Sequence, residues 1–325
     1  MHPLKLIPDN TNIDFLRWRV PAMAISVLLI IASIALVATR GLNLGVDFVG
    51  GQVVRATFPQ AVQVDQLRAR VDSLGLGEAS IQQFGSPRDV SIRLPLPQGG
   101  DAAASAAADR VRAALTRAYP GVRIASVDTV SGKVSGELFR KGAWALALAM
   151  LGVSLYIWLR FEWQFGVGAL FSLFHDVALT LGFFSLTWLE FDLNIVAAIL
   201  TIIGYSLNDT IVVYDRVREN LRKYRRMGMV ELLNLSTNET LSRTIVTSLS
   251  IMMALAALVI LGPAVIFGFS LAMFLGIVIG TYSSIYIANP ILIWTGVTGQ
   301  SFVTSRTASG VEGAERVGPK AERGA

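Results

Sequence analysis

The sequence predicts a polytopic α-helical membrane protein with six transmembrane helices and one folded domain outside the membrane. Hydrophobic residues make up 53% of the 325 residues, charged residues make up only 16%, and the mean hydropathy is +0.56. Soluble domains contain about 25% charged residues. Six apolar runs approach the ~20 residues that a helix needs to cross a bilayer. These runs are residues 20–39, 142–159, 165–188, 193–214, 245–261 and 265–288.

Lys and Arg residues in the short loops predict the orientation of the chain. They precede the first run, lie between the second and third, and crowd the segment between the fourth and fifth. The turns at 190–192 and 262–264 fall on the opposite side and contain neither residue. We therefore expect both termini in the cytoplasm. The expected parts are an N-terminal segment (1–19), a first helix (20–39), an external domain (40–141), a bundle (142–292) with a cytoplasmic loop (215–243), and a disordered tail (293–325).

The external segment has the composition and the patterning of a soluble domain. Alternating apolar residues predict strands at 52–58, 79–84, 89–94 and 122–130, and helical spacing predicts helices at 64–74 and 102–119. The resulting order βαββαβ is that of a ferredoxin-like domain. Glycines in the two connecting segments, 40–51 and 131–142, favour hinges on which the domain could rotate, and the alternative is that they only form tight turns.

Composition and motifs argue against several other classes of function. The chain has no cysteine and only two histidines, which excludes a disulfide framework and a thiolate or histidine-rich metal centre. The carboxylates of the external segment are scattered and form no catalytic pair, and no GxxxxGK[ST] phosphate-binding loop occurs. The net charge of +5 is explained by the cytoplasmic Lys and Arg residues, so we expect no nucleic-acid partner. We expect a protein that is not an enzyme and has no ATPase of its own.

The fourth apolar run contains a carboxylate, Asp209, deep within its length. At about 1.5 Å per residue, Asp209 lies roughly 21 Å along a helix from Ile195, about two-thirds of the way through a hydrocarbon layer of ~30 Å. An ionisable group at this depth is costly, and the usual reason for its presence is function. Burial favours the neutral carboxyl whereas a nearby Arg favours the carboxylate, so the group could change protonation when its partner moves.

Other polar residues of the membrane runs could assist Asp209. Helical spacing places Tyr205 on the same face as Asp209, which indicates a polar stripe that faces the bundle interior. We expect Gly204 to permit close helix approach. The full set of candidate residues for proton coupling is Asp209, Arg243, Asp176 and His175, with Asn208, Tyr205 and Ser206 as supporting polar groups.

Three of these residues also have a simpler explanation. Arg243 could be a positively charged anchor at the inner membrane surface, where its long side chain snorkels to water. His175 could be a hydrogen-bonded packing residue, and Asp209 could form a structural hydrogen bond between helices. The function-linked interpretation has the proton as coupling ion, with no metal and no other cofactor.

Five blocks of the sequence resemble the SecF family of the bacterial SecDF protein-export complex. They are LGVDFVGG (44–51), LRFEWQF (159–165), LFHDVALTLGFF (173–184), GYSLNDTIVVYDRVREN (204–220) and LSTNETLSRTIVTS (235–248), within a resemblance that covers about 15–294. The resemblance implies the resistance-nodulation-division architecture, the bacterial inner membrane, a periplasmic ferredoxin-like domain and a SecD-like partner. It also implies that Asp209 and Arg243 match the family's functional aspartate and arginine.

The function implied is promotion of preprotein export by the proton-motive force. The expected partners are the SecD-like subunit, the SecYEG translocon with YajC as a further candidate, unfolded preprotein and membrane lipid. Two alternatives stay open. The chain could be half of a proton-coupled exporter of small molecules, or a purely structural subunit that stabilises the translocon. A structural subunit would tolerate Asp209→Asn, because an amide preserves most hydrogen bonding.

Overall fold

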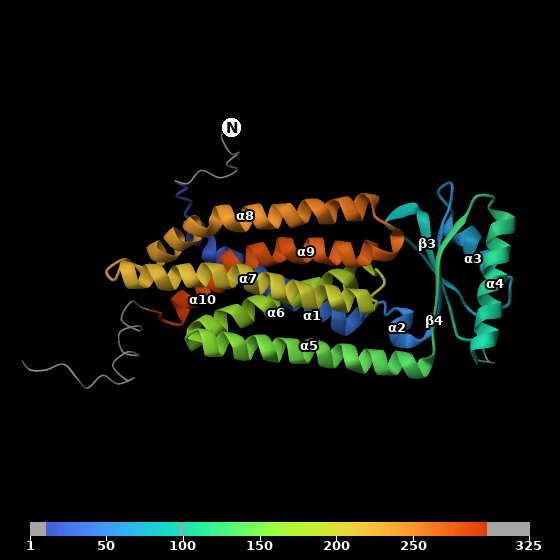
Figure 1. The fold of residues 1–325 in the computed structure, drawn as a ribbon, viewed down its shortest axis with the longest axis horizontal. Helices are drawn as coiled ribbons and strands as arrows, with labels where there is room; N and C mark the ends of the chain where they lie inside the picture. Colours follow the sequence, from blue (N-terminus) through green and yellow to red (C-terminus); the bar gives the residue numbers. More distant parts are fainter. Residues whose placement is uncertain (1–10, 98–99, 298–325) are drawn as a thin grey trace, which may run out of the picture.

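The computed structural model describes residues 11–97 and 100–297, as a helical bundle with a small sheet domain at one end (Figure 1). Six helical segments of the described chain are long and apolar enough to cross a membrane, which confirms the number predicted. Five are single helices: α1 (Arg19–Arg40), α5 (Gly132–Arg160), α6 (Trp163–Thr187), α7 (Leu193–Lys223) and α8 (Met229–Leu261). The sixth consists of α9 (Phe267–Ser283), a π-helical turn η3 (Ser284–Ala288) and α10 (Asn289–Trp294).

Several helices extend beyond the apolar runs that predicted them. Helix α5 begins at Gly132 instead of 142, and the predicted cytoplasmic loop 215–243 is mostly helical because only residues 224–228 separate α7 from α8. The reason is polar pairing between the two helices outside the apolar region. Asn220 of α7 donates to Ser236 at 3.0 Å and to Glu239 at 2.7 Å, and Arg216 pairs with Glu239 at 2.8 Å.

The sixth span is interrupted by the π-helical turn, which the sequence analysis did not predict. Pro290 follows this turn at the start of α10. Proline has no backbone N–H and its ring crowds the preceding helical turn, so a local change of helix type relieves the conflict. The carbonyl of Ala288, at the end of the π turn, accepts a hydrogen bond from the Tyr214 hydroxyl at 3.0 Å, which ties the irregular turn to α7.

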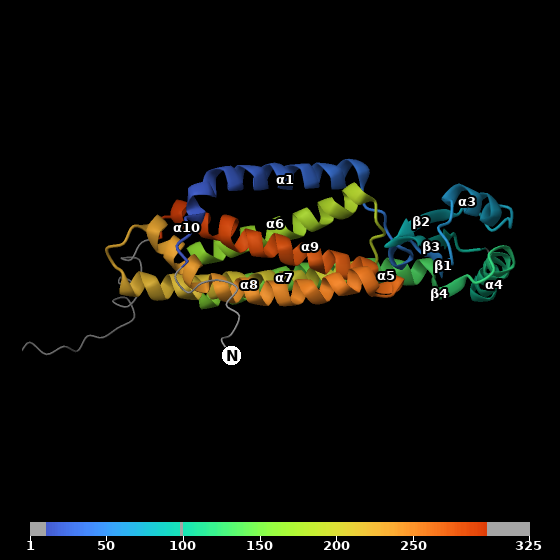
Figure 2. The same cartoon turned by 90° about the horizontal axis from the view of Figure 1, so that it is seen from above.

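The sheet domain has the predicted order of strands and helices. It comprises β1 (Gly51–Thr57), α3 (Val64–Asp72), β2 (Ser80–Phe84), β3 (Ser86–Leu94), α4 (Gly100–Ala118) and β4 (Arg123–Val130). The strands form one antiparallel sheet in the order β2-β3-β1-β4. Helices α3 and α4 lie on the side of the sheet away from the bundle (Figures 1 and 2). A short unpredicted helix, α2 (Val46–Val49), precedes β1.

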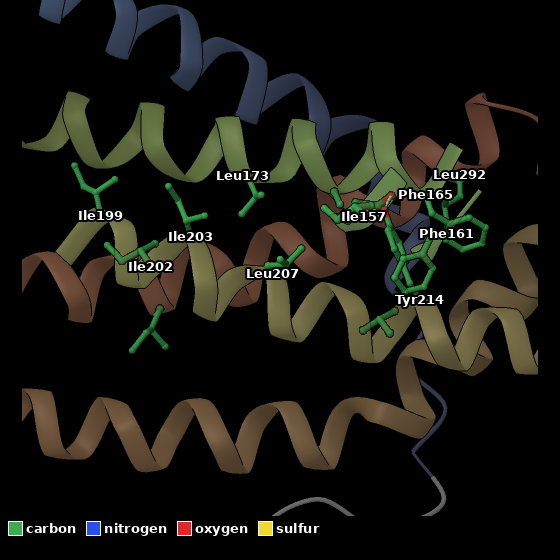
Figure 3. Packing of buried hydrophobic residues seen from close by; sticks show 14 of the residues in the cluster. Ile157, Phe161, Phe165, Leu173, Ile199, Ile202, Ile203, Leu207, Tyr214 and Leu292 are labelled. Carbon is green, nitrogen blue, oxygen red and sulfur yellow. Dashed lines mark hydrogen bonds between the residues drawn. The ribbon is translucent and has the colours of Figure 1, made fainter. Parts of the chain in front are cut away.

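Two separate hydrophobic cores stabilise the two parts of the molecule. In the sheet domain, Val54 and Ile92 pack beneath Leu67, Val111 and Leu115 of the covering helices, and all five are fully buried. In the bundle, aliphatic side chains of α6 and α7 interdigitate along the helices, and aromatic residues close one end (Figure 3). There the rings of Phe165 and Tyr214 meet edge to face at 5.0 Å.

Close contact between α7 and α9 depends on glycines of α9. A Cβ atom at Gly276 would overlap the Ile202 side chain, and one at Gly280 would lie 3.1 Å from the Ser206 Cβ. Gly204, the residue expected to permit close approach, has no atom within 4 Å of its Cβ position, so that expectation was wrong. The small residues that matter lie on the opposing helix, which the polar pattern of α7 alone could not indicate.

We predict that Gly276→Ala destabilises the bundle by about 1–3 kcal/mol, because the added methyl group must push α9 away from Ile202. Gly204→Ala is the matched control. It adds the same methyl group in open space, and replacing a helical glycine gains up to about 1 kcal/mol. Thermal unfolding in detergent micelles measures both. Equal melting temperatures of the two variants would contradict this packing.

Candidate functional site

Asp209 of α7 is buried in the bundle with only 3% of its surface exposed. The Ser248 hydroxyl of α8 and the charge of Arg243, which lies nearer the N-terminus of α8, both act on its carboxyl. Atom Oδ2 of Asp209 is buried without a hydrogen-bond partner in the described chain. Arg243 itself is exposed, and no ion pair within 4.0 Å joins these two described residues. The arrangement is an incompletely satisfied carboxyl with a cation nearby.

Three hydroxyl groups, one each from α7, α8 and α9, meet at Ser248 beside Asp209. The Ser248 hydroxyl lies 3.0 Å from the Tyr205 hydroxyl and 3.0 Å from that of Thr281 on α9. Thr281 donates its own proton to the carbonyl of Ile277 at 2.9 Å. Ser248 therefore has one proton for three neighbours, Asp209, Thr281 and the Tyr205 hydroxyl, of which Tyr205 can also act as the donor. A carboxylate at position 209 attracts this proton, whereas a protonated Asp209 can donate to Ser248 and release the Ser248 proton to Thr281.

A second polar cluster surrounds Asp176 of α6, which is 1% exposed. Its Oδ1 lies 2.9 Å from Nδ1 of the neighbouring His175, and its Oδ2 accepts hydrogen bonds from Ser206 of α7 and, at 2.9 Å, from Ser283 of α9. Ser172 extends the cluster by donating to Ser283 at 2.8 Å. Both oxygens of Asp176 are therefore satisfied, unlike those of Asp209. The cluster joins three helices at one buried point.

His175 links the Asp176 cluster to the first helix. Its ring lies 6.0 Å from that of Tyr282, at an interplanar angle of 31°. The Tyr282 hydroxyl donates to the carbonyl of Ala22 on α1 at 3.0 Å and lies 3.0 Å from the Ser26 hydroxyl. Atom Nε2 of His175 is buried and lacks a hydrogen-bond partner in the described chain. The histidine thus has one nitrogen held by Asp176 and one nitrogen free to accept or donate.

The structure brings most of the predicted site residues together around α7. Tyr205 and Ser206 are consecutive, so their side chains reach the Asp209 and Asp176 clusters on different sides of the helix. Asn208 is exposed and makes no hydrogen bond in the described chain, so it belongs to neither cluster. Four further residues of the two clusters were not predicted from the sequence: Ser172, Ser248, Thr281 and Ser283. Small hydroxyl residues within apolar helices were the available signal, since such groups commonly bond across helices.

Metal binding has no support in the described residues. Across residues 11–97 and 100–297, no group of three or more His, Asp or Glu side chains is arranged to hold an ion.

We predict that Asp176→Leu destabilises the bundle by about 2 kcal/mol, because three hydrogen-bonding side chains lose a shared buried partner. Ser250→Ala serves as a control on α8, since the Ser250 hydroxyl is exposed and bonds only to its own helix at the Val246 carbonyl. Unfolding in detergent should separate the two variants clearly. A melting temperature for Asp176→Leu equal to that of the control would show that the cluster is not stabilising.

Comparisons with known proteins agree with this architecture. Residues 110–298 match the protein-family model "Protein export membrane protein SecD/SecF, C-terminal", and residues 35–62 match "SecD/SecF GG Motif". Protein translocase subunit SecF of Rhodobacter capsulatus is 43% identical over 306 residues, which covers 90% of this chain and 92% of the relative. The corresponding protein of Cereibacter sphaeroides is 46% identical over 301 residues, covering 90% and 93%.

Two solved structures of SecDF are also similar. The crystal structure of SecDF, a translocon-associated membrane protein from a Thermus species, has a TM-score of 0.80 at 34% identity and is matched over 90% of this chain. SecDF in its super-membrane-facing form has a TM-score of 0.65 at 33% identity over 92% of this chain. This chain spans 40% of either SecDF chain. With matches of this extent along its length, the chain belongs to the SecF family of protein translocase subunits.

Proposed function

We propose that this chain acts with a SecD-like subunit to promote the export of unfolded preproteins by using the proton-motive force. The observation that carries the proposal is the buried Asp209 carboxyl, which has one unsatisfied oxygen and a cation, Arg243, that acts on it without a close ion pair. Such a group can take up and release a proton as its surroundings change. ATP hydrolysis would be the task of another component of the translocase.

The exposed groups near Asp209 support a partner in the membrane. Arg243 and Asn208 are both exposed on the surface of the isolated bundle, and α5 is mostly exposed along its apolar length. Polar groups at this depth need a protein surface or water to face. A second bundle of similar size, supplied by a SecD-like subunit, would meet this need and would account for the part of SecDF that this chain does not span.

The proposal also includes the location of the chain and the role of its sheet domain. We place the chain in the bacterial inner membrane with both termini in the cytoplasm, and we assign the sheet domain to the periplasm as a ferredoxin-like domain. The βαββαβ order and the antiparallel strand order β2-β3-β1-β4 support that assignment. SecYEG would supply the channel, with YajC as a further partner. The periplasmic domain would hold and release the emerging preprotein.

In the proposed mechanism, Asp209 accepts the proton and Arg243 is its counter-charge. Protonation would reverse the direction of hydrogen bonding at Ser248 and thereby change the contact between α7, α8 and α9. Asp176 and His175 would keep α6 attached to α7 while this change occurs. One charge crossing a 100 mV potential releases about 2.3 kcal/mol, which shifts a two-state equilibrium tens-fold.

We predict that Asp209→Asn abolishes proton-driven export while the protein still inserts and assembles, because the amide keeps hydrogen bonding but cannot carry a proton. Export of a preprotein into energised, Na⁺-free inner-membrane vesicles measures the effect. Asp215→Asn is the control, since Asp215 lies on the same helix but pairs with Arg160 at the surface at 3.1 Å. Full proton-driven export by Asp209→Asn would instead support a purely structural subunit.

We predict that Arg243→Met loses most proton-driven export and that Arg243→Lys is intermediate. Methionine removes the charge, whereas lysine retains a point charge but not the planar guanidinium. The same vesicle assay applies, with Arg225→Met as a control because Arg225 lies in the segment between α7 and α8. Wild-type export by Arg243→Met would assign this residue to anchoring at the membrane surface.

A small-molecule exporter is the remaining alternative, and the same vesicles can test it. An exporter would move a hydrophobic dye in a proton-dependent and Asp209-dependent manner, whereas the proposed function predicts preprotein export without dye transport.

A further inference from the structure

The sheet of the external domain presents a polar face to the bundle. The strand registers align Gln82, Ser91, Arg55 and Ser126 in one row that crosses all four strands. The opposite face carries apolar side chains such as Ile92, which pack against α3 and α4. Interfaces between domains that move are commonly polar, because both surfaces can return to water at little cost. The polar side chains of this face therefore favour a reversible contact between the sheet and the bundle.

Two ion pairs connect this polar face to the turn between α6 and α7, residues 188–192. Arg93 lies 3.3 Å from Glu190, and Arg55 lies 3.9 Å from Asp192, with all four side chains only 12–19% exposed. Ser91 also donates to Glu190 at 3.4 Å. Pairs that are largely shielded from solvent are screened less by salt than surface pairs are. Salt therefore screens this contact less than it screens an exposed pair, and the contact favours one position of the domain.

The same turn is rigidly joined to the helix that carries Asp209. Asp192 is the N-cap of α7, where its side chain accepts from the Ile195 amide at 3.1 Å. The next amide, that of Leu193, donates to Asp47 of α2 at 2.9 Å. Asp192 therefore belongs both to the start of α7 and to the contact with the sheet. Asp209 follows on the same continuous helix, about 25 Å away.

The interface leaves room for water and lies close to the connectors of the domain. A cavity of about 40 Å³ separates the sheet from the ends of the helices, lined in part by Arg55, Asp192 and Phe267. This volume is sufficient for a water molecule. The two connectors approach each other just before β1, where a Cβ atom at Gly50 would lie 3.2 Å from the Cα atom of Gly132. The sheet can therefore tilt about this meeting point when the ion pairs break.

We propose that Arg55 and Arg93 of the sheet, with Asp192 and Glu190 of the turn, form a latch that couples the position of the external domain to α7. The role of the latch in export rests on the function proposed above, but its existence does not. In the latched state the domain is held against the bundle by charge. In the released state the two connectors and the hydrogen bond from Gln82 of β2 to the Trp188 carbonyl, at 2.9 Å, still join it to the bundle. A movement at the start of α7 is then converted into rotation of the sheet.

The latch is sensitive to protons from the external side. Burial raises the pKa of Asp192 and the nearby Glu190 carboxylate adds to this effect, while the Ile195 amide, Asn194 and Arg55 oppose it. The charged groups that face Asp192 are Arg55 from β1, Glu190 from its own turn and Asp47 from α2, with Asp128 of β4 acting through Arg55. Asp192 therefore binds a proton at a pH above the usual carboxyl range of about 4, and its ion pair weakens as the external pH falls.

Distances between two spin labels test the latch in the full chain in lipid nanodiscs. The chain has no cysteine, so Ala113→Cys on α4 and Leu261→Cys at the end of α8 provide two unique and exposed sites. Glu190→Gln combined with Asp192→Asn removes both charges, while asparagine still caps a helix and glutamine still accepts a hydrogen bond. We expect a displaced population that is about tenfold larger than in the wild-type chain, and the same trend on acidification.

Control variants separate the latch from general damage. Asp65→Asn removes an exposed ion pair of the same domain, with Arg68 of α3 at 2.9 Å, without touching the latch, and should leave the distance distribution unchanged. Arg55→Gln combined with Arg93→Gln breaks the same two pairs from the sheet side and must produce the same displaced population. An unchanged distribution in either double variant would overturn the latch.

The readout also distinguishes the latch from the proposed function, because it needs no proton gradient, partner or preprotein. If Asp209→Asn retained export while the latch variants moved the labels, the proton role would fail and the latch would stand. If Asp209→Asn stopped export and the labels did not move, only the latch would fail.

Discussion

The structure depends on one constraint, which is that polar groups buried among apolar helices must find partners within the protein. The two carboxyl groups of the bundle meet this constraint to different degrees. Asp176 is bonded at both oxygens and holds α6, α7 and α9 together, whereas Asp209 leaves one oxygen unsatisfied. A carboxyl group whose two oxygens both accept hydrogen bonds is stabilised in one protonation state. A carboxyl group with an unbonded oxygen can bind a proton there without losing a hydrogen bond. This difference supports the proposal that Asp176 stabilises the bundle and Asp209 binds the proton.

The same constraint explains why α7 is the central element. Its consecutive residues Tyr205 and Ser206 reach the two clusters, its N-cap Asp192 contacts the external sheet, and its inner end pairs with α8 through Asn220. A helix is stiff along its axis, so a displacement of α7 at one of these contacts also displaces the others. Glycines on α9 let that helix approach α7 closely, and hydroxyl groups of α9 bond to Ser248 of α8 and to Asp176 of α6.

Sequence periodicity predicted the elements well where each pattern is local. The strands and helices of the external domain agree with the prediction to within a few residues, because their alternation depends on a single buried face. Three features were not predictable in this way. The polar ends of α7 and α8 that lie next to residues 224–228 are helical because Asn220 and Glu239 pair across them. The π turn depends on how the chain accommodates Pro290. The role of Ser248 depends on its three neighbours, Tyr205, Thr281 and Asp209, which come from different helices.

Infrared difference spectroscopy of the chain with its SecD-like partner in vesicles tests the central claim, that Asp209 is the carboxyl that gains and loses the proton. The measurement compares spectra before and after acidification of the external side. The account predicts a carboxylic-acid C=O band that appears in the wild-type protein and in Asp215→Asn but is absent in Asp209→Asn. A band of wild-type intensity in Asp209→Asn would contradict it, because another group would then carry the proton.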